Sequence, residues 1–323
     1  MMFRVLVIGC GRIATGISKF DPSSHGAVFK KNKDTKIFGC FDVNKKNSEN
    51  FANMYNCKTY KNLKLAIHET KPDIISLCTP DETHFEILKV ILTSDFEVRV
   101  ILVEKPICTN KNQFKEIEKL TKHKKTNIFV NHTRRFALQF LNIKKQIQKN
   151  FFGEIKYINA FYYNGWLHNG VHIIDTILFL FNEKIVIDKT IENIKSSYKS
   201  DKTFDVQAKF SNSKCIINIV GFNEKYYQIM EWDFLFTKGR LRITDFGNKI
   251  DFETVKENCK GEKELKFKNN FLIKNNNYPL QNIIDKIVIG LKNNNFESLS
   301  AINLKNAKST MDVLWQGVKK YEN

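Results

Sequence analysis

The chain has 323 residues, of which 42% are hydrophobic and 27% charged, and its formal net charge is +18. This length exceeds one comfortable hydrophobic core and the mixed composition excludes a disordered or fibrous protein, so we expect two globular domains. Only seven of the 52 basic residues are arginines, and the lysines are spread along the chain, which is typical of a solvated surface and argues against a nucleic-acid partner.

No membrane partner is expected either. The longest apolar run is interrupted at Asp175, short of the about 20 residues that a spanning helix needs. The N-terminal run MMFRVLVIGC leads straight into glycines without a small-residue cleavage pattern, which favours a first strand over a signal peptide. The seven cysteines are scattered singly, so we expect neither a disulfide framework nor a zinc site, and the simplest localisation is cytoplasmic.

A nucleotide-binding pattern opens the chain. The buried-strand run FRVLVI leads into GCGRIA, which places Gly9, Gly11 and Ala14 in the spacing G-x-G-x-x-A. Glycine is needed there because the backbone turns tightly and then approaches a pyrophosphate, to which the next helix offers free N–H groups. This turn predicts a dinucleotide site.

A second strand pattern, KIFGCFD, ends at Asp42. Its carboxylate would accept hydrogen bonds from an adenosine ribose, and the alternative is a strand-end or capping role. A carboxylate there repels a 2′-phosphate, so NAD is favoured over NADP, although Lys45 and Lys46 weaken this preference. Asp42 lies further from the glycines than is usual, so we expect residues 20–35 to include an extended loop.

Strand and helix patterns then alternate. The strands are expected at residues 73–80, 98–106 and 126–132, and the helices at 81–94 and 110–125. Such alternation predicts a parallel Rossmann sheet, whose ligands bind beyond the carboxyl ends of the strands. The residues expected at that edge are Gly9, Thr79, Pro80, Lys105 and Asn131.

The second half has a different pattern. A helix is expected at 136–150, a strand at 153–164 and a largely antiparallel set of strands from Ile185 to Glu257. The TKGR turn predicts a hairpin in which Gly239 supplies a positive φ. Residues 257–277 are expected to form an exposed, mobile loop, and two closing helices are expected at 280–293 and 299–321.

One apolar helix pattern, GWLHNGVHIIDTILFLF at 165–181, carries His168, His172 and Asp175. Spacings of four and three place the three side chains on one side of a helix. They form a functional stripe, a metal site or a satisfied core cluster, and we expect no metal.

Five motifs in this order resemble the Gfo/Idh/MocA oxidoreductase family, the glucose–fructose oxidoreductase and inositol dehydrogenase group. The motifs are GCGRIA at 9–14, CTPDETH at 78–84, EKP at 104–106, NHTRRF at 131–136 and GVHIID at 170–175. The resemblance implies an α/β protein with an N-terminal Rossmann parallel sheet at 1–131. A C-terminal α+β domain at 132–323 follows, built on a mostly antiparallel open sheet that makes contacts in a homo-oligomer, a dimer or a tetramer. It also implies a sugar or cyclitol substrate lying between the nicotinamide and the helix at 165–181.

The resemblance also assigns catalytic roles. The family's E-K-P lysine and G-x-H-x-x-D histidine flank the reacting carbon and correspond to Lys105 and His172. A hydroxyl must lose its proton as hydride leaves the same carbon, so a base is needed, and an ammonium favours the developing alkoxide. We expect His172 to be the general acid/base and Lys105 to polarise the substrate oxygen, with exchanged roles as the alternative. The bond to Pro106 is often cis in the family.

One position departs from the family. Many inositol dehydrogenase-like members carry Asp where this chain has His168, and a protonated imidazole there lowers the pKa of a neighbouring imidazole. His168 contacts the substrate, acts as the base itself or fills the place of the missing carboxylate. Asp175 orients His172 or bonds the backbone or the dinucleotide domain.

The remaining site predictions follow from the same motifs. The predicted cofactor contacts are Gly9, Gly11, Arg12, Ile13, Ala14, Asp42, Thr79, Pro80, His84, Glu104 and Lys105. The predicted substrate contacts are Arg134, Arg135, Trp166, Asn169 and Asp175. The two arginines bind a substrate phosphate or form structural ion pairs, Trp166 stacks on a sugar and Asn169 recognises a hydroxyl.

The sequence therefore predicts an NAD(P)-dependent oxidoreductase that transfers hydride between nicotinamide and a sugar hydroxyl or keto carbon. The basic charge and the arginines favour a phosphorylated or nucleotide-linked sugar, as in surface-polysaccharide biosynthesis. The alternatives are an inositol or free-sugar dehydrogenase, an enzyme that uses NAD transiently to cleave a glycosidic bond, and a non-catalytic dinucleotide-binding sensor.

Overall fold

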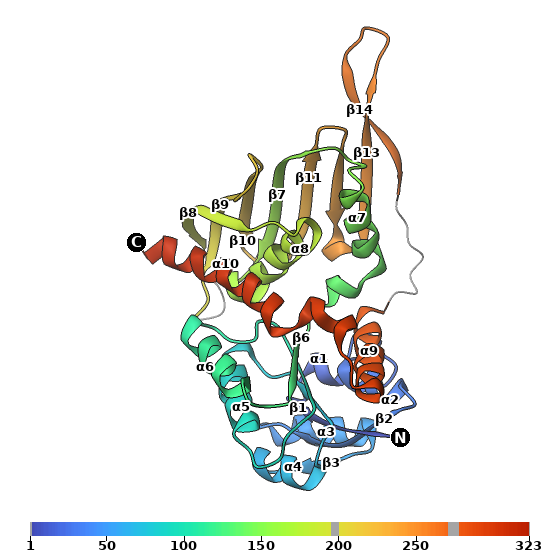
Figure 1. Cartoon of the computed structure of the whole chain (residues 1–323), viewed down its shortest axis with the longest axis vertical. Coiled ribbons are helices and arrows are strands. Elements are labelled where there is room, and N and C mark those ends of the chain that lie inside the picture. Colours follow the sequence, from blue (N-terminus) through green and yellow to red (C-terminus); the bar gives the residue numbers. More distant parts are fainter. Residues whose placement is uncertain (1, 195–199, 271–277, 323) are drawn as a thin grey trace. The chain divides into compact units, whose positions relative to one another are not determined.

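The structure is a computed structural model that describes residues 2–194, 200–270 and 278–322, and it divides into two compact units (Figure 1). The first unit comprises Met1–Phe136 and Tyr278–Lys308, and the second comprises Ala137–Asn277 and Ser309–Asn323. The sequence analysis placed residues 278–308 in the second domain. Their contacts group them with the first, because the helix they contain buries its apolar side chains in the first unit's core.

The first unit contains a six-stranded parallel sheet in the order β3-β2-β1-β4-β5-β6. Its strands are β1 Phe3–Ile8, β2 Thr35–Phe41, β3 Lys58–Tyr60, β4 Ile74–Leu77, β5 Val100–Val103 and β6 Asn127–Val130. β1, β4 and β5 are buried at nearly every position, as expected for a sheet covered on both faces. The predicted Rossmann sheet is confirmed.

Helices connect these strands: α1 Arg12–Thr15, α2 His25–Lys31, α3 Lys45–Tyr55, α4 Leu63–Thr70, α5 His84–Leu92 and α6 Lys111–Thr121. One further helix of this unit, α9 Pro279–Asn293, comes from the later part of the chain. Short 3₁₀ turns occur at η1 Asp81–Thr83, η2 Thr133–Phe136 and η5 Glu297–Ile302. The loop expected within residues 20–35 lies earlier than predicted, between α1 and α2. Ser24 caps the N-terminus of α2, so the helix already begins at His25.

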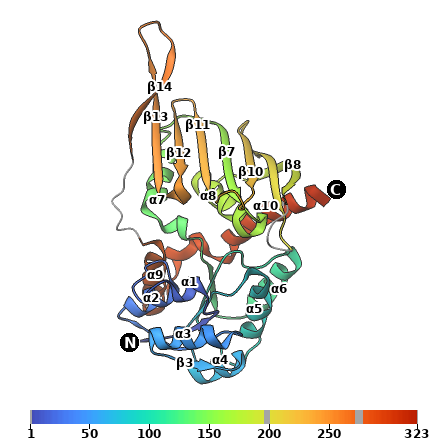
Figure 2. The same ribbon diagram turned by 180° about the vertical axis from the view of Figure 1, so that it is seen from behind.

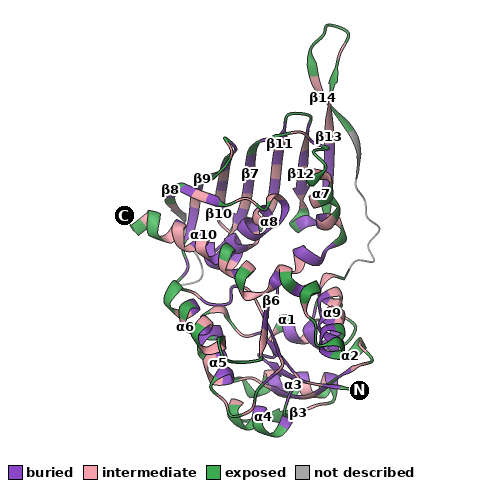
Figure 3. Cartoon of the chain, viewed as in Figure 1, coloured by how far each residue is buried: buried purple, intermediate pink, exposed green. Residues whose placement is uncertain are grey.

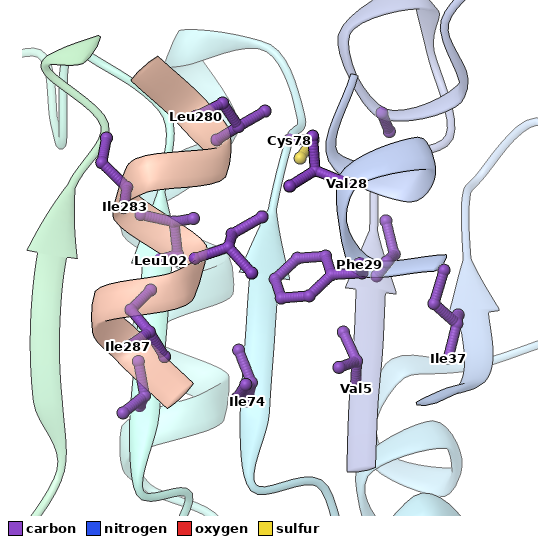
Figure 4. Packing of buried hydrophobic residues seen from close by; sticks show 14 of the residues in the cluster. Val5, Val28, Phe29, Ile37, Ile74, Cys78, Leu102, Leu280, Ile283 and Ile287 are labelled. Atoms are coloured by element: carbon purple, nitrogen blue, oxygen red, sulfur yellow. The ribbon is translucent and has the colours of Figure 1, made fainter. Parts of the chain in front are cut away.

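α9 completes the core of the first unit. Its Leu280, Ile283 and Ile287 are at most 3% exposed and point toward Leu102 of β5, while Phe29 of α2 lies beside them (Figure 4). Apolar residues at this helical spacing form one face. A helix from the later part of the chain therefore packs against a sheet that is formed by the first 130 residues.

The second unit contains an eight-stranded sheet in the order β14-β13-β12-β11-β7-β10-β9-β8. Its strands are β7 Ile155–Tyr163, β8 Ile185–Ile194, β9 Thr203–Phe210, β10 Ile216–Phe222, β11 Glu231–Phe236, β12 Gly239–Thr244, β13 Lys249–Glu257 and β14 Lys263–Asn270. Among the described residues of this sheet, every pair of neighbouring strands is antiparallel except β7 with β10. The mostly antiparallel sheet predicted from the alternating patterns is confirmed.

One face of this sheet is covered by helices. α7 Leu138–Gln148, α8 Val171–Phe181 and the part of α10 (Leu304–Glu322) from Ser309 onward lie on the same side (Figures 1 and 2). Buried and partly exposed residues alternate along β10, β11 and β12 (Figure 3), because successive side chains of a strand point to opposite faces. The short turns of this unit are η3 Trp166–Gly170 and η4 Asp245–Gly247.

Two expectations for this unit are wrong. Gly239 does not have a positive φ; instead, a Cβ there would lie 2.3 Å from the Glu253 carbonyl oxygen, so glycine permits the close approach of β12 to β13. Residues 263–270, expected in a loop, form β14 by pairing with β13. The rest of that expected loop, 271–277, lies outside the described residues.

Among the helices that the structure describes, none combines the length and the apolar character needed to cross a membrane.

Candidate active site

The glycine turn after β1 has the geometry that the sequence predicts. Gly9 has φ +83°, a conformation that favours glycine. A Cβ there would also lie 2.7 Å from backbone atoms of Cys78 and Thr79, so glycine is needed for the loop after β4 to approach this closely. Gly11 precedes α1, and a Cβ there would meet nothing within 4 Å. The two glycines thus serve different purposes. Gly9 allows the close approach of the loop after β4, and Gly11 leaves open space in front of the turn.

That open space is bordered by donors. The N–H groups of Gly11, Arg12 and Ile13 have no acceptor among the residues that the structure describes, because the first N–H groups of a helix have no intrahelical partner. Arg12 and Ile13 have exposed side chains, whereas Ala14 is fully buried. Open space beside free donors fits the diphosphate of a dinucleotide.

Asp42 is tied to this turn. Its Oδ2 accepts a hydrogen bond of 2.7 Å from the Cys10 N–H, and its Oδ1 accepts one of 2.7 Å from the Asn44 N–H. A carboxylate has about four acceptor positions on its two oxygens, so these bonds leave capacity for ribose hydroxyls. The structure therefore gives Asp42 the capping role that was the alternative reading and leaves the ribose role open to it.

His84 connects two loops at the carboxyl edge of the sheet. It is fully buried, and its Nδ1 and Nε2 lie 2.7 Å from the Pro106 carbonyl oxygen and 2.8 Å from that of Thr79. Thr79 is partly exposed and Pro80 exposed. His84 thus joins the loop after β4 to the loop after β5, so its effect on a ligand would pass through these loops.

Glu104 and Lys105 follow β5, both partly exposed, and the Lys105–Pro106 peptide is cis, as the resemblance implied. Glu104 Oε1 lies 2.9 Å from His25 Nε2 and accepts a hydrogen bond of 2.5 Å from Asn131 Nδ2. The sequence analysis missed His25, because nothing in the first 30 residues indicates that the start of α2 reaches the end of β5.

The two groups stabilise each other's charge. Burial disfavours the Glu104 carboxylate, but the His25 and Asn131 hydrogen bonds and the Lys105 charge lower the pKa of Glu104 to about 2. Burial likewise disfavours a charged His25 ring, whereas Cys78 and Glu104 raise the pKa of His25 to about 10. An ion pair between the buried His25 ring and the partly exposed Glu104 carboxylate therefore lies directly beside Lys105 in the sequence.

The two arginines after β6 differ. Arg135 is 6% exposed and its Nη1 donates to the Ala301 carbonyl oxygen at 2.9 Å, which joins η2 to η5. Arg134 is partly exposed. The contact of Arg135 supports the structural reading for that residue.

The helical segment of the second unit begins with a π-helical turn, Trp166–Gly170, before α8. Trp166 is fully buried, and its indole Nε1 donates to the Leu314 carbonyl oxygen at 2.9 Å. The prediction that Trp166 stacks on a sugar is therefore wrong: the residue is part of the core. Asn169 is 5% exposed, and its Nδ2 donates to the Asn164 carbonyl oxygen at 2.9 Å.

Asp201 holds the start of this segment. Its Oδ1 and Oδ2 accept the N–H groups of Leu167 and His168 at 2.9 and 2.8 Å, in the manner of a helix cap. Gly165 has φ +89°, and a Cβ there would lie 2.4 Å from Asp201 Oδ2. The sequence analysis missed Asp201, since it lies 33 residues after His168 and no local pattern marks it.

The three polar residues do not form one exposed stripe. His168 and His172 are partly exposed, whereas Asp175 is 3% exposed and its Oδ1 accepts a hydrogen bond of 3.0 Å from Thr310 of α10. This contact joins Asp175 to a side chain of its own unit, and it is neither the backbone bond nor the dinucleotide-domain bond that was expected as the alternative to orienting His172. No group of three His, Cys, Asp or Glu side chains within the described ranges is placed to hold a metal ion.

Comparisons with known proteins agree with this geometry. The chain is 29% identical over 163 residues to an uncharacterized oxidoreductase, YhhX, of Escherichia coli (strain K12), a match that covers 45% of this chain and 46% of that protein. The chain thus spans less than half the length of the curated relatives it matches.

Two solved structures resemble nearly the whole chain. A UDP-N-acetylglucosamine 3-dehydrogenase from Acidithiobacillus ferrooxidans superposes with a TM-score of 0.73 at 14% identity, covering 100% of this chain and 98% of the other. A 3-ketoreductase from Actinomadura kijaniata, in complex with NADP and TDP-benzene, superposes with a TM-score of 0.79 at 12% identity, covering 99% and 98%. At such identities the likeness shows the fold.

The family model gives the assignment. Residues 3–132 match the oxidoreductase family GFO_IDH_MocA, described as having an NAD-binding Rossmann fold. This range contains the glycine turn, Asp42 and the Glu104–Lys105–Pro106 motif, so residues 3–132 match the NAD-binding Rossmann domain of the Gfo/Idh/MocA oxidoreductase family.

Proposed function

We propose that the protein is an NAD(P)-dependent oxidoreductase that transfers hydride between nicotinamide and a sugar hydroxyl or keto carbon. One observation carries the proposal: the open turn at Gly11, its free N–H groups and the Asp42 carboxylate belong to the same carboxyl edge as Glu104 and Lys105. A dinucleotide held by the first group brings its reactive ring to a sheet edge that also carries a lysine.

The cofactor would be held by the backbone and one carboxylate. The N–H groups of Gly11, Arg12 and Ile13 donate to the diphosphate, and Asp42 accepts from the ribose hydroxyls. When bound, nicotinamide accepts or supplies the hydride. The negative charge of Asp42 favours NAD over NADP, because it repels a 2′-phosphate.

The proton is handled by side chains of this chain. Lys105, as an ammonium, donates a hydrogen bond to the substrate oxygen and favours its negative charge. His172, half-buried on α8, takes the hydroxyl proton in the oxidative direction and returns it in the reductive one. His168, whose N–H is fixed by Asp201, contacts the substrate from the turn before α8.

A phosphorylated or nucleotide-linked sugar is the proposed substrate. Among proteins of the same fold, one is named a UDP-N-acetylglucosamine 3-dehydrogenase, and another is a 3-ketoreductase whose structure holds NADP and TDP-benzene. The net charge of +18 favours an anionic substrate, and Arg134 in η2, the turn after β6, offers a bidentate phosphate donor.

The test follows absorbance of reduced nicotinamide while the protein and NAD or NADP are mixed with free, phosphorylated and nucleotide-linked sugars, and with inositols. We expect turnover with one class of anionic sugar, and its loss in Lys105→Ala while NADH still binds. Turnover restricted to neutral inositols or free sugars would contradict the substrate class. NADH binding without turnover across the panel would instead favour a sensor.

We also propose a homo-oligomer formed through the uncovered face of the eight-stranded sheet. That face carries partly or largely exposed apolar side chains, among them Tyr157 of β7 and Ile216 of β10, which are 46% and 44% exposed. Exposed apolar residues grouped on a sheet face mark an interaction surface. A monomeric mass by light scattering at micromolar concentration would contradict this.

A further inference from the structure

His25 joins the ends of two strands beneath the carboxyl edge of the first unit's sheet. It is the first residue of α2 and is fully buried. Its Nδ1 lies 2.7 Å from Ser76 Oγ on β4, and its Nε2 lies 2.9 Å from Glu104 Oε1 after β5. Both ring nitrogens are therefore engaged, and the one facing the carboxylate must carry a proton.

Asn131 adds a third strand end. Its Nδ2 donates to the same Glu104 Oε1 at 2.5 Å and lies 3.4 Å from His25 Nε2. One carboxylate oxygen thus receives an imidazole N–H and an amide N–H from two elements. Charge-assisted bonds of this kind are short and directional, so they fix the position of the carboxylate.

We propose that His25 is a positioning residue: it remains an imidazolium and, with Asn131, fixes the Glu104 carboxylate so that Lys105 is held as an ammonium at the substrate edge. This inference rests on the proposed function, because it assigns the charge state that Lys105 needs in order to polarise a substrate oxygen. It also favours His172 over Lys105 as the proton acceptor, since a lysine kept protonated is no base at neutral pH.

The physical reason is electrostatic. Removing a carboxylate from water costs free energy unless an opposite charge compensates its own charge. The His25 ring supplies that positive charge. The titratable groups that face the His25 ring are Cys78, at the end of β4, and Glu104; Glu104 in turn is influenced by Lys105, the next residue. An anion fixed beside Lys105 favours the protonated lysine.

The first test needs no substrate. In ¹⁵N-histidine NMR of the whole protein, the His25 ring signals are assigned by their loss in His25→Gln, with exposed His68→Gln as the matched control. We expect both ring nitrogens to show the shifts of an imidazolium at pH 7.5, where an ordinary histidine is neutral. A neutral His25 ring at that pH would overturn the proposal.

The second test measures the pKa of Lys105. Lysines are ¹³C-methylated reductively, Lys105 is assigned by its loss in Lys105→Arg, and its pKa is compared between the wild type and His25→Gln/Glu104→Gln. The double variant replaces the ion pair with two amides and leaves no unpaired buried charge, so it is the variant expected to fold. A fall in the pKa of Lys105 supports the proposal, and an unchanged value overturns it.

A third test applies once the substrate panel has given a turnover. In His25→Gln we expect kcat to fall at least about tenfold while the Kd for NADH stays within about twofold, since only the lysine side of the site is disturbed. An acidic limb should also appear in the pH profile of kcat as Glu104 becomes protonated within the assay range. An unchanged profile with only a lower thermal midpoint would show a structural role and overturn the proposal. Failure of the panel alone would contradict the proposed function but leave both NMR results decisive.

Discussion

The carboxylate of Asp42 accepts a hydrogen bond of 2.7 Å from the N–H of Cys10, the residue between the two glycines of the first turn. The bond links the end of β2 to the turn after β1. The Asp42 side chain therefore fixes the turn and still has positions at which it can accept further hydrogen bonds.

Replacing Asp42 tests whether its carboxylate also binds the cofactor. We expect Asp42→Ala to weaken NADH binding by about tenfold, the loss of one or two hydrogen bonds to a charged acceptor. Asp42→Asn keeps one oxygen acceptor and should weaken NADH binding less. Both variants should bind NADPH relatively better, because the charge that repels a 2′-phosphate is gone. Fluorescence titration of the two reduced cofactors measures this, and unchanged NADH affinity in Asp42→Ala would refute the ribose role.

The two glycines of the turn form a matched pair of variants. Gly9→Ala forces a Cβ to 2.7 Å from backbone atoms at φ +83°, so we expect the free energy of unfolding to fall by about 2 kcal/mol or more. Gly11→Ala has free space and φ −72°, so its stability should change by no more than about 0.5 kcal/mol. Its methyl group would nevertheless occupy the space beside the free N–H groups and weaken NADH binding. Urea unfolding and NADH titration of both variants test this, and wild-type NADH affinity in Gly11→Ala would exclude the diphosphate from this turn.

The ion pair of His25 and Glu104 predicts a pH window of stability. Glu104 has a pKa lowered from 4.5 to about 2, so its contribution is present above pH 4.5 and is lost as the pH falls toward 2. His25 has a pKa raised from 6.5 to about 10, so its contribution is complete below pH 6.5 and is lost as the pH rises toward 10. The pair therefore stabilises the fold most between pH 4.5 and 6.5.

This window is measured as the difference in unfolding free energy between the wild type and His25→Gln/Glu104→Gln at several pH values. The difference should shrink on both sides of the window. A difference that is flat from pH 4 to pH 9 would show that the two groups do not carry their charges as described. The single variant His25→Gln, which leaves the carboxylate unpaired, should be less stable than the double variant by about 3 kcal/mol.

Asp201 should control the order of the segment that carries His168. Asp201→Ala removes the acceptor of two N–H groups at the start of the π-helical turn, and we expect a loss of about 1–2 kcal/mol in unfolding free energy. Asp95→Ala, an exposed change in the first unit, serves as the control. Faster amide hydrogen exchange at Leu167 and His168 would accompany the loss, and exchange as slow as in the wild type would contradict the capping role.

Trp166 should matter for stability and not for sugar recognition. Trp166→Phe keeps the aromatic packing against Tyr162 but removes the bond from the indole to the Leu314 carbonyl. That carbonyl lies inside α10 and keeps its helical donor, so we expect the loss of one hydrogen bond to cost about 1 kcal/mol. We expect KM for the sugar to remain unchanged. A raised KM at wild-type stability would restore the stacking role that burial excludes.

Local patterns determined much of this molecule. Alternating strand and helix runs predicted the parallel sheet, and the G-x-G-x-x-A spacing predicted a tight turn after the first strand, where Gly9 has φ +83°. These features are readable because they depend on residues close together in the chain: a strand's burial shows in its own composition, and a turn's geometry shows in its glycines.

Contacts between distant residues decided the rest. The bond between His25 and Glu104 spans 79 positions, and the one between Trp166 and Leu314 spans 148. The sequence around His25, the first residue of α2, and around Trp166 would be the same whether these side chains were exposed, catalytic or buried. Only the folded chain, by bringing a partner or a core around each side chain, fixes its solvation and its charge, and with them its role.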